Sequence, residues 1–416
     1  MENSGSNRGF GAAIDLGTTT LAGSLVDLAT GEALASSAAP NPQYRWGRDV
    51  VSRIDAAIKD ASTLEELSFA ARQACLALIE GLAGERKGLV REITVAGNSA
   101  MEHIFLGISP ETLSRVPYRP AFKDARTLPA REAGIDLEAN LYVFPLIGGF
   151  VGGDAVAVAL SLGFGRGKGT ELVIDIGTNS EIILAHGGEI FATSAAAGPA
   201  FEGGEVAQGM VAATGAIEGV AIEGESVRLS VIGSAAPKGI CGSGLIEAVH
   251  ALIGAGVIDP SGRIADPDEI GTNLASRIKT GNDGNSFVLY RGAKGEVSLT
   301  QADVRALQTA KSATRAGMNI LLEKAGLLPG AVEKVYVAGA FGSRLSQGSL
   351  KGIGLLHALW ENVEYVGDAA LKGAEMALSE EHRTEAGEIA KKARYVPLSG
   401  SARFEREFIR NMDFGI

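Results

Sequence analysis

The stretch Leu172-Val-Ile-Asp-Ile-Gly-Thr-Asn-Ser-Glu-Ile182 decides the fold, because an apolar strand delivers an aspartate and a glycine to a tight turn and then resumes as a strand. A second copy, Ala12-Ala-Ile-Asp-Leu-Gly-Thr-Thr-Thr-Leu21, repeats the same order of residue types. Glycine lets backbone N–H groups approach an anion, threonine adds a hydroxyl donor, and aspartate can hold a hydrated cation. We therefore expect two phosphate-binding turns, with Asp15 and Asp175 as metal ligands.

The repeated turn indicates a duplicated domain with its ligand between the halves. One copy alone is weak evidence, because the pattern also occurs in plain hairpins. The chain has 416 residues, enough for two cores. The glycine- and base-rich stretch Gly163–Thr170 predicts the boundary. We expect a disordered lead over 1–10, a first domain over 11–165, and a second over 166–416 with a surface excursion near 256–298.

The composition is that of a globular protein, with 46% apolar and 21% charged residues. A net charge of −11 argues against a nucleic-acid partner. The two cysteines, Cys75 and Cys241, are too few for a disulfide framework and favour a reducing cytoplasm. The apolar run from 141 to 165 contains Asp154 and many glycines. It therefore predicts a buried strand, turn and helix, and no membrane partner.

Two further strands end in Val-Ala-Gly, at Gly97 and at Gly339. Such strand-to-helix turns lie at the carboxyl ends of parallel strands, where open α/β sheets bind ligands. The sequence leaves open whether Gly97 contacts a ligand or only permits the turn. The loop 41–50 is equally open between a surface loop that caps a helix and a lip for a partner or substrate.

Three predicted helices begin near candidate site residues. Asp154 opens an alanine-rich helix, as a first-turn acid or as a functional group. The small residues Gly242 and Ser243 begin another helix, whose N-terminus suits an anion although no Walker pattern is present. A capping-box variant at Thr300 predicts a long helix through Lys324 that stops at Gly326. One face of that helix carries Gln308, Lys311 and Arg315, which either face solvent or lie beside a nucleotide.

The two Asp-x-Gly-Thr hairpins, the alanine-rich connecting helix and the late Ala-Gly-Ala-Phe-Gly string resemble the actin, sugar-kinase and heat-shock chaperone ATPase superfamily. The resemblance implies an α/β fold with two ribonuclease-H-like domains flanking a nucleotide cleft. More narrowly, the chain resembles the reductive activators of corrinoid-dependent methyltransferases. The strings that carry this likeness are AIDLGTTT, NPQYRWGRDVVSRI, AGNSAM, GGFVGGD, IDIGTNSEI, AAGPAFEGG, PKGICGSGLIEAV and VYVAGAFG.

This resemblance implies an ATP hydrolase that uses Mg²⁺ and restores cob(I)amide from cob(II)amide on a corrinoid protein. Asp154 is implied to orient or deprotonate the attacking water. The implied phosphate and metal contacts are Asp15, Gly17, Thr18 and Thr19 from one domain and Asp175, Gly177, Thr178 and Asn179 from the other. The implied adenosine contacts are Gly339, Ala340, Phe341 and Gly342, with Gln308, Lys311 and Arg315 on the neighbouring helix. A homodimer is compatible with this resemblance.

One departure from the family concerns electron transfer. Members usually carry an N-terminal ferredoxin-like domain with an iron–sulfur cluster, whereas here the ATPase pattern begins by Gly11. Two cysteines do not supply a four-thiolate site. We therefore expect no iron–sulfur cluster in this chain and a ferredoxin-like domain or protein as electron donor.

Three alternatives share the fold. A small-molecule kinase needs the same phosphate clamp, and a chaperone- or actin-like switch binds nucleotide without redox output. An activator of radical dehydratases would use Cys75 and Cys241 as cluster ligands across a dimer.

Overall fold

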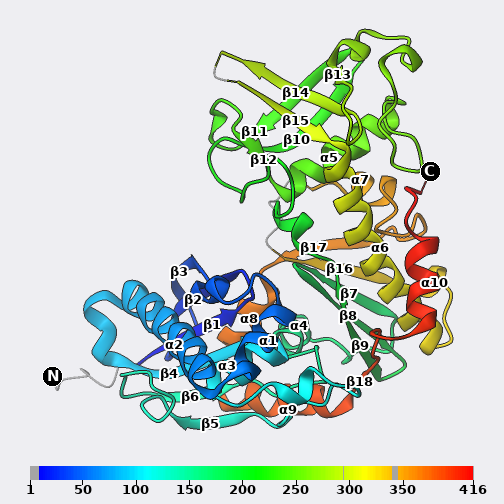
Figure 1. Ribbon diagram of the computed structural model, residues 1–416. Helices are drawn as coiled ribbons and strands as arrows, with labels where there is room; N and C mark the ends of the chain where they lie inside the picture. The colour runs from blue at the N-terminus through cyan, green and yellow to red at the C-terminus, as the bar shows by residue number, and fades with distance from the viewer. Residues whose placement is uncertain (1–8, 294, 340–344, 416) are drawn as a thin grey trace. The chain divides into compact units, whose positions relative to one another are not determined.

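The computed structural model describes residues 9–293, 295–339 and 345–415, which form two compact units (Figure 1). The first unit comprises Met1–Glu171, Ile183–Thr193 and Asp368–Pro397. The second comprises Leu172–Ile182, Ser194–Gly367 and Leu398–Ile416.

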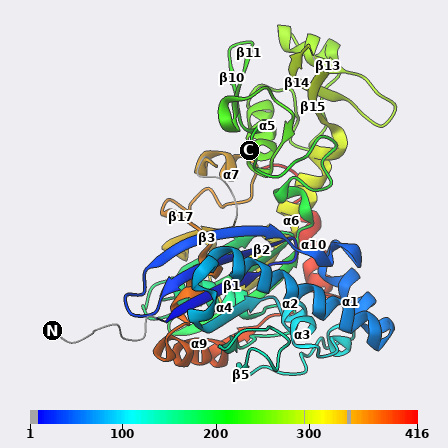
Figure 2. The same ribbon diagram turned by 90° about the vertical axis from the view of Figure 1, so that its left-hand side faces the viewer.

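A mixed six-stranded sheet forms the centre of the first unit, in the order β3-β2-β1-β4-β6-β5. Its strands are β1 (Phe10–Leu16), β2 (Thr20–Asp27), β3 (Ala33–Pro40), β4 (Val90–Gly97), β5 (Arg126–Pro129) and β6 (Asn140–Val143). β1 is antiparallel to β2 but parallel to β4, and Figure 2 shows β1, β2 and β3 side by side. The predicted hairpin and strand-to-helix turn therefore belong to neighbouring strands.

Side-chain alternation gives this sheet two covered faces. Ile14 and Leu16 belong to one buried cluster with residues of α1 (Val50–Lys59), α2 (Ala61–Ala83) and α3 (Ser99–Leu106). On the other face, Thr94 Oγ1 donates to the carbonyl of Ala374, 2.7 Å away. Ala374 belongs to α8 (Ala369–Met376), which packs beside α4 (Gly153–Ser161). Asp15 alternates with Ile14 and therefore lies on the α8 face.

A second six-stranded sheet has the order β17-β16-β7-β8-β9-β18. Its strands are β7 (Glu171–Ile176), β8 (Asn179–His186), β9 (Glu189–Ala196), β16 (Lys334–Ala338), β17 (Val363–Gly367) and β18 (Ala393–Tyr395). In this sheet β9, β8, β7 and β16 follow the same order as β3, β2, β1 and β4 in the first. The predicted internal repeat is therefore a repeat of strand order, with Asp15 and Asp175 on equivalent strands.

The second unit contains the long helix α6 (Gln301–Lys324), which begins with the predicted capping box between Thr300 and Asp303. Gly326 ends it with a φ of 70°. α10 (Ala402–Arg410) lies alongside α6 (Figure 1). Two three-stranded sheets complete the unit, with β10 (Ala216–Glu223), β11 (Ser226–Val231) and β12 (Gly239–Ile240) in one and β13 (Ile278–Lys279), β14 (Ser286–Gly292) and β15 (Gly295–Thr300) in the other.

The remaining helices are α5 (Gly242–Gly254), α7 (Gln347–Gly352) and α9 (Glu380–Lys392). In the part of the chain that the structure describes, no helix combines the length and apolar character needed to cross a bilayer. The apolar run from 141 to 165 forms β6, a turn and α4, as predicted.

Candidate functional site

The turn between β1 and β2 is held by two asparagines. Asn41 Nδ2 donates to the carbonyl of Gly17 at 2.9 Å, and Asn98 Nδ2 donates to Thr18 Oγ1 at 3.0 Å. A Cβ on Gly17 would lie 2.5 Å from the carbonyl oxygen of Thr20, so the turn admits only glycine there. The predicted residues Gly17, Thr18 and Thr19 thus form a turn whose two side-chain anchors are uncharged.

Sequence reasoning missed both asparagines as parts of this site. Asn41 Oδ1 also accepts from Gln43 N at 3.0 Å, and Asn98 Oδ1 accepts from Met101 N at 3.0 Å, so each residue caps a helix. Asparagine is a preferred N-cap residue, and an Asn at each of two helix starts was the available signal. Its second hydrogen bond, from the amide nitrogen to the turn, depends on tertiary structure.

The turn that carries Asp154 packs against this assembly. A Cβ on Gly152 would lie 2.3 Å from the carbonyl oxygen of Gly97 and 2.5 Å from the Cα of Asn98. A Cβ on Gly97 would in turn lie 2.9 Å from the carbonyl oxygen of Leu16. Gly97 therefore has a packing reason to be glycine, and a ligand contact there stays a prediction. Three segments distant in sequence meet at the end of β1.

The pKa of the Asp154 carboxyl lies close to neutral pH. Its Oδ1 accepts from the N–H of Ala155 at 2.7 Å, in the first turn of α4. Burial raises the pKa of Asp154 to about 6, so the group is mainly ionised at pH 7. A perturbed carboxyl next to a candidate phosphate turn is suited to orient water or accept its proton.

The second turn is held by a carboxylate. Thr178 donates twice to Glu202, from its backbone N to Oε1 at 3.1 Å and from Oγ1 to Oε2 at 2.9 Å. Glu202 ends the short helix η4 (Pro199–Glu202), and Asn179 begins β8. A Cβ on Gly177 would have its nearest neighbours at 3.3 and 3.4 Å. Sequence reasoning read the Glu202 segment only as a loop into a helix start, and its lone acid among small residues was the signal.

The ends of β7 and β16 bring Asp175 and Gly339 together. A Cβ on Gly339 would lie 2.5 Å from the carbonyl oxygen of Ile176 and 3.4 Å from Asp175 Oδ1. The φ of Gly339 is 115°, which also favours glycine. The other predicted adenosine contacts, Ala340, Phe341 and Gly342, lie outside the described residues.

The donor set near the predicted turns is compatible with Mg²⁺. Among the described residues there is no group of three or more His, Cys, Asp or Glu side chains arranged to hold a metal ion. Mg²⁺ is commonly bound by one or two carboxylates together with water and substrate phosphates, not by an all-protein cage. Asp15 and Asp175 supply that type of ligand.

The start of α5 has a packing explanation. A Cβ on Gly242 would lie 1.6 Å from the carbonyl oxygen of Phe201. Ser243 is buried, and its Oγ lies 3.3 Å from the sulfur of Cys241. Cys241 and Cys75 are both buried, as expected for packing residues. An anion contact at Gly242 and Ser243 stays a prediction.

The polar side chains Gln308, Lys311 and Arg315, on one face of α6, form a row that contacts residues of the same unit, including its C-terminal segment. Gln308 Nε2 donates to the carbonyl of Met412 at 3.0 Å, and the Lys311 ammonium donates to the carbonyl of Asp413. Arg315 donates to the carbonyl of Leu355 at 3.2 Å and lies over the ring of Trp360. Burial lowers the pKa of Lys311 to about 8 and that of Arg315 to about 10. The predicted common face is present, and its polar groups have partners within the protein, so nucleotide contact stays a prediction.

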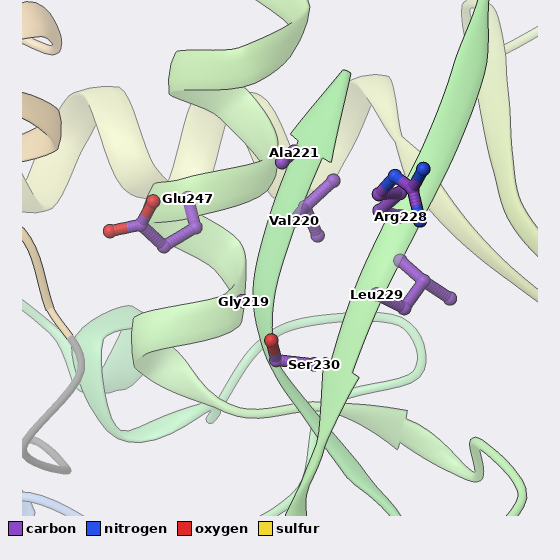
Figure 3. Close-up of a pocket in the computed structure, with 7 residues that line it drawn as sticks. All are labelled: Gly219, Val220, Ala221, Arg228, Leu229, Ser230 and Glu247. Atoms are coloured by element: carbon purple, nitrogen blue, oxygen red, sulfur yellow. The ribbon is translucent and has the colours of Figure 1, made fainter. Parts of the chain in front are cut away.

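An open hollow of about 760 Å³ lies elsewhere, against β10, β11 and α5. Figure 3 shows Val220 on β10, Leu229 and Arg228 on β11, and Glu247 on α5, with its carboxylate directed away from Arg228. Glu247 Oε1 accepts from the N–H of Ser346 at 3.1 Å. None of the predicted site residues lines this hollow.

Comparison with known families accounts for the repeated turns and both halves of the chain. Residues 10–166 match the model of the RACo middle region, and residues 169–415 match the C-terminal domain of RACo, described as the ASKHA domain. The chain belongs to the RACo family. ASKHA domains are of the actin-like ATPase type, so the predicted actin-like α/β fold is confirmed.

Three relatives support this membership. The corrinoid activation enzyme RamQ of Eubacterium limosum is 32% identical over 98% of this chain and 70% of its own length. The [Co(II) methylated amine-specific corrinoid protein] reductase of Methanosarcina barkeri is 26% identical over 97% of this chain and 77% of its own. A solved reductive activator for corrinoid, iron–sulfur protein is 37% identical, with a TM-score of 0.90, over 99% of this chain and 67% of its own. The predicted resemblance to reductive activators of corrinoid proteins is confirmed.

Proposed function

We propose that this chain is the ATPase portion of a reductive activator that restores cob(I)amide from cob(II)amide on the corrinoid protein of a methyltransferase system. The observation that carries the proposal is the match of nearly the whole chain to corrinoid activators, combined with two Asp-x-Gly-Thr turns on equivalent strands. The balanced reaction adds one electron to cob(II)amide, while ATP and water give ADP and phosphate. The electron comes from a ferredoxin-like donor domain or protein.

Phosphoryl transfer needs residues that position the phosphates, neutralise their charge and activate water, and the site residues fill these three roles. We assign the backbone N–H groups around Gly17 and Gly177 to the phosphates. Asp15 and Asp175 would hold Mg²⁺, which neutralises phosphate charge when it is bound. Asp154 orients the attacking water and accepts its proton, because its carboxyl is ionised at pH 7 and stands at the turn against Gly97 and Asn98.

The decisive experiment measures ATP hydrolysis and cob(I)amide formation together. The chain is mixed with a corrinoid protein in the cob(II)amide state, a ferredoxin-like donor and a low-potential reductant, and cob(I)amide is followed by its absorbance. We expect ATP-dependent cob(I)amide formation and faster hydrolysis in the presence of the corrinoid protein. The absence of both responses would contradict the activator function, and phosphate transfer to a sugar or acid would instead indicate a kinase.

Asp154→Asn is the matched variant for the water-activating role. We expect it to lower kcat for hydrolysis by about 100-fold or more, the usual contribution of a general base. In the wild type, hydrolysis should fall about tenfold per pH unit below about pH 6, because the base must be ionised. A wild-type rate independent of pH in this range would remove Asp154 from the role.

A further inference from the structure

A second buried carboxyl, that of Glu102, lies beneath the turn that carries Asp154. Glu102 belongs to α3 and is 0% exposed. Its Oε1 accepts from the N–H of Gly97 at 3.1 Å. A Cβ on Gly153 would lie 2.2 Å from that same oxygen, so the backbone preceding Asp154 rests directly on the Glu102 side chain.

The surroundings of the other oxygen of Glu102 favour a protonated carboxyl. Oε2 is buried and has no hydrogen-bond partner among the described residues. An ionised carboxylate with one oxygen buried away from any donor is strongly unfavourable, and protonation removes this buried charge. No cation is among the groups that shift the pKa of Glu102, and the charged group that acts on it is Asp154.

The surrounding groups favour the same assignment. Burial, followed by the negative charge of Asp154, raises the pKa of Glu102 well above its ordinary value. The hydroxyl of Tyr142 is also buried without a partner among the described residues, and burial raises its pKa. The cation of this neighbourhood, Arg383, lies over the ring of Tyr142 at 5.0 Å and pairs with Glu92 at 2.7 Å.

We propose that Glu102 is a neutral acid that shares one proton with Asp154 and acts as its positioning residue. Two carboxyl groups close together in a buried site hold a single negative charge between them, and the pair ionises as a unit. In this arrangement the negative charge lies on Asp154, toward the water it activates. The inference rests on the proposed function for that activating role, whereas the shared proton is supported by the buried oxygen of Glu102 that has no partner among the described residues, its position against Gly153 and the charge of Asp154.

The test of the shared proton is the pH dependence of urea unfolding in wild type, Glu102→Gln, Asp154→Asn and the double variant. A folded pKa raised above the unfolded value of about 4.3 stabilises the protein at low pH, and this stabilisation is lost as pH rises. The folding equilibrium constant of wild type relative to E102Q should therefore fall by up to tenfold per pH unit above about pH 4.5. With D154N as background the fall should end at a lower pH, because Glu102 then ionises more easily.

Glu66→Gln, on the exposed surface of α2, is the control and should leave the pH dependence unchanged. A parallel pH dependence in wild type and E102Q would show that Glu102 is ionised in the folded protein and would overturn the proposal. If Glu102→Gln changed the pH dependence of unfolding equally in the wild type and in D154N, the shared proton would be overturned.

The positioning role is tested by hydrolysis. Glu102→Leu should lower kcat about tenfold with an unchanged KM for ATP, because a contact used in the transition state is lost. E102Q keeps an uncharged donor and should restore most of the rate. Equal rates in E102L and wild type would remove the positioning role. A wild type without hydrolysis would instead contradict the proposed function, while the unfolding measurements would still decide the shared proton.

Discussion

The two Asp-x-Gly-Thr turns follow equivalent strands but are held by different side chains. Asn41 and Asn98 hold the first turn through neutral amides, whereas Glu202 holds both donors of Thr178 in the second. A carboxylate beside a phosphate site adds repulsion that an amide does not. The two halves therefore share the strand order and the aspartate but differ in the side chains that hold the turn.

The largest effect on ATP hydrolysis is expected from replacing the aspartate that precedes each turn. Asp15→Asn and Asp175→Asn each remove one candidate metal ligand and should lower kcat/KM for ATP by at least about 100-fold, equivalent to about 2.7 kcal/mol. Steady-state hydrolysis at several Mg²⁺ concentrations measures this, with circular dichroism as a check on folding. A loss in only one of the two variants would show that the turns are not functional equivalents.

Gly17 and Gly177 differ in how much space surrounds them, so alanine substitution should affect the stability of the two turns differently. Gly17→Ala places a methyl group 2.5 Å from the carbonyl oxygen of Thr20 and should lower the free energy of unfolding by about 2 kcal/mol. Gly177→Ala meets nothing closer than 3.3 Å and should change it by less than about 0.5 kcal/mol. Urea unfolding of the two variants measures the difference. Equal destabilisation would contradict the structural asymmetry of the turns.

Exchanging the anchors' charge should change nucleotide affinity in opposite directions. Glu202→Gln removes a negative charge beside the second turn and should tighten ATP binding roughly fivefold, or about 1 kcal/mol. Asn98→Asp adds a charge beside the first turn and should weaken binding by a similar factor, while Asp still caps α3. Calorimetric titration with ATP measures both. Changes of the same sign would indicate that the anchors act through folding and not through charge.

Low pH should destabilise α3, whose first residues follow the anchor Asn98, because α3 carries the buried His103. The His103 ring accepts from the N–H of Ala121 at 2.9 Å, its other ring nitrogen lies 2.6 Å from the carbonyl of Ser99, and burial lowers its pKa. Its stabilising contribution is complete above the unfolded pKa of about 6.5 and is lost as pH falls toward the folded pKa. We expect a loss of less than about 1 kcal/mol between about pH 6.5 and 5.5.

Urea unfolding across this range measures the loss, with His103→Gln as the comparison. The variant has no proton to gain at this position and should lack this part of the decline. The same slope in both proteins would show that the pKa of His103 is equal in the folded and unfolded states, and would contradict its lowering by burial.

Local patterns predicted the strands, the repeat and the capping box at Thr300, because each depends on neighbouring residues. Tertiary contacts explain what was missed. Asn98 reaches Thr18 across 80 positions and Glu202 reaches Thr178 across 24, and no local pattern specifies such pairs. The α6 row shows the same limit: helical spacing predicts a common face, but its partners depend on how the chain folds back.

The hydrogen bonds that α6 donates to the C-terminal segment end on backbone carbonyls. Gln308 and Lys311 contact residues 412 and 413 through groups that every amino acid carries. Substitutions along this stretch can therefore accumulate over evolution without loss of those bonds. Shortening it is different, since removal of residues 411–416 would leave the Lys311 ammonium without this acceptor. For protein engineering, the hydrogen bonds of α6 therefore require the length of this segment, whereas the buried Phe414, whose ring centre lies 5.3 Å from Lys311 Nζ, also contributes its side chain.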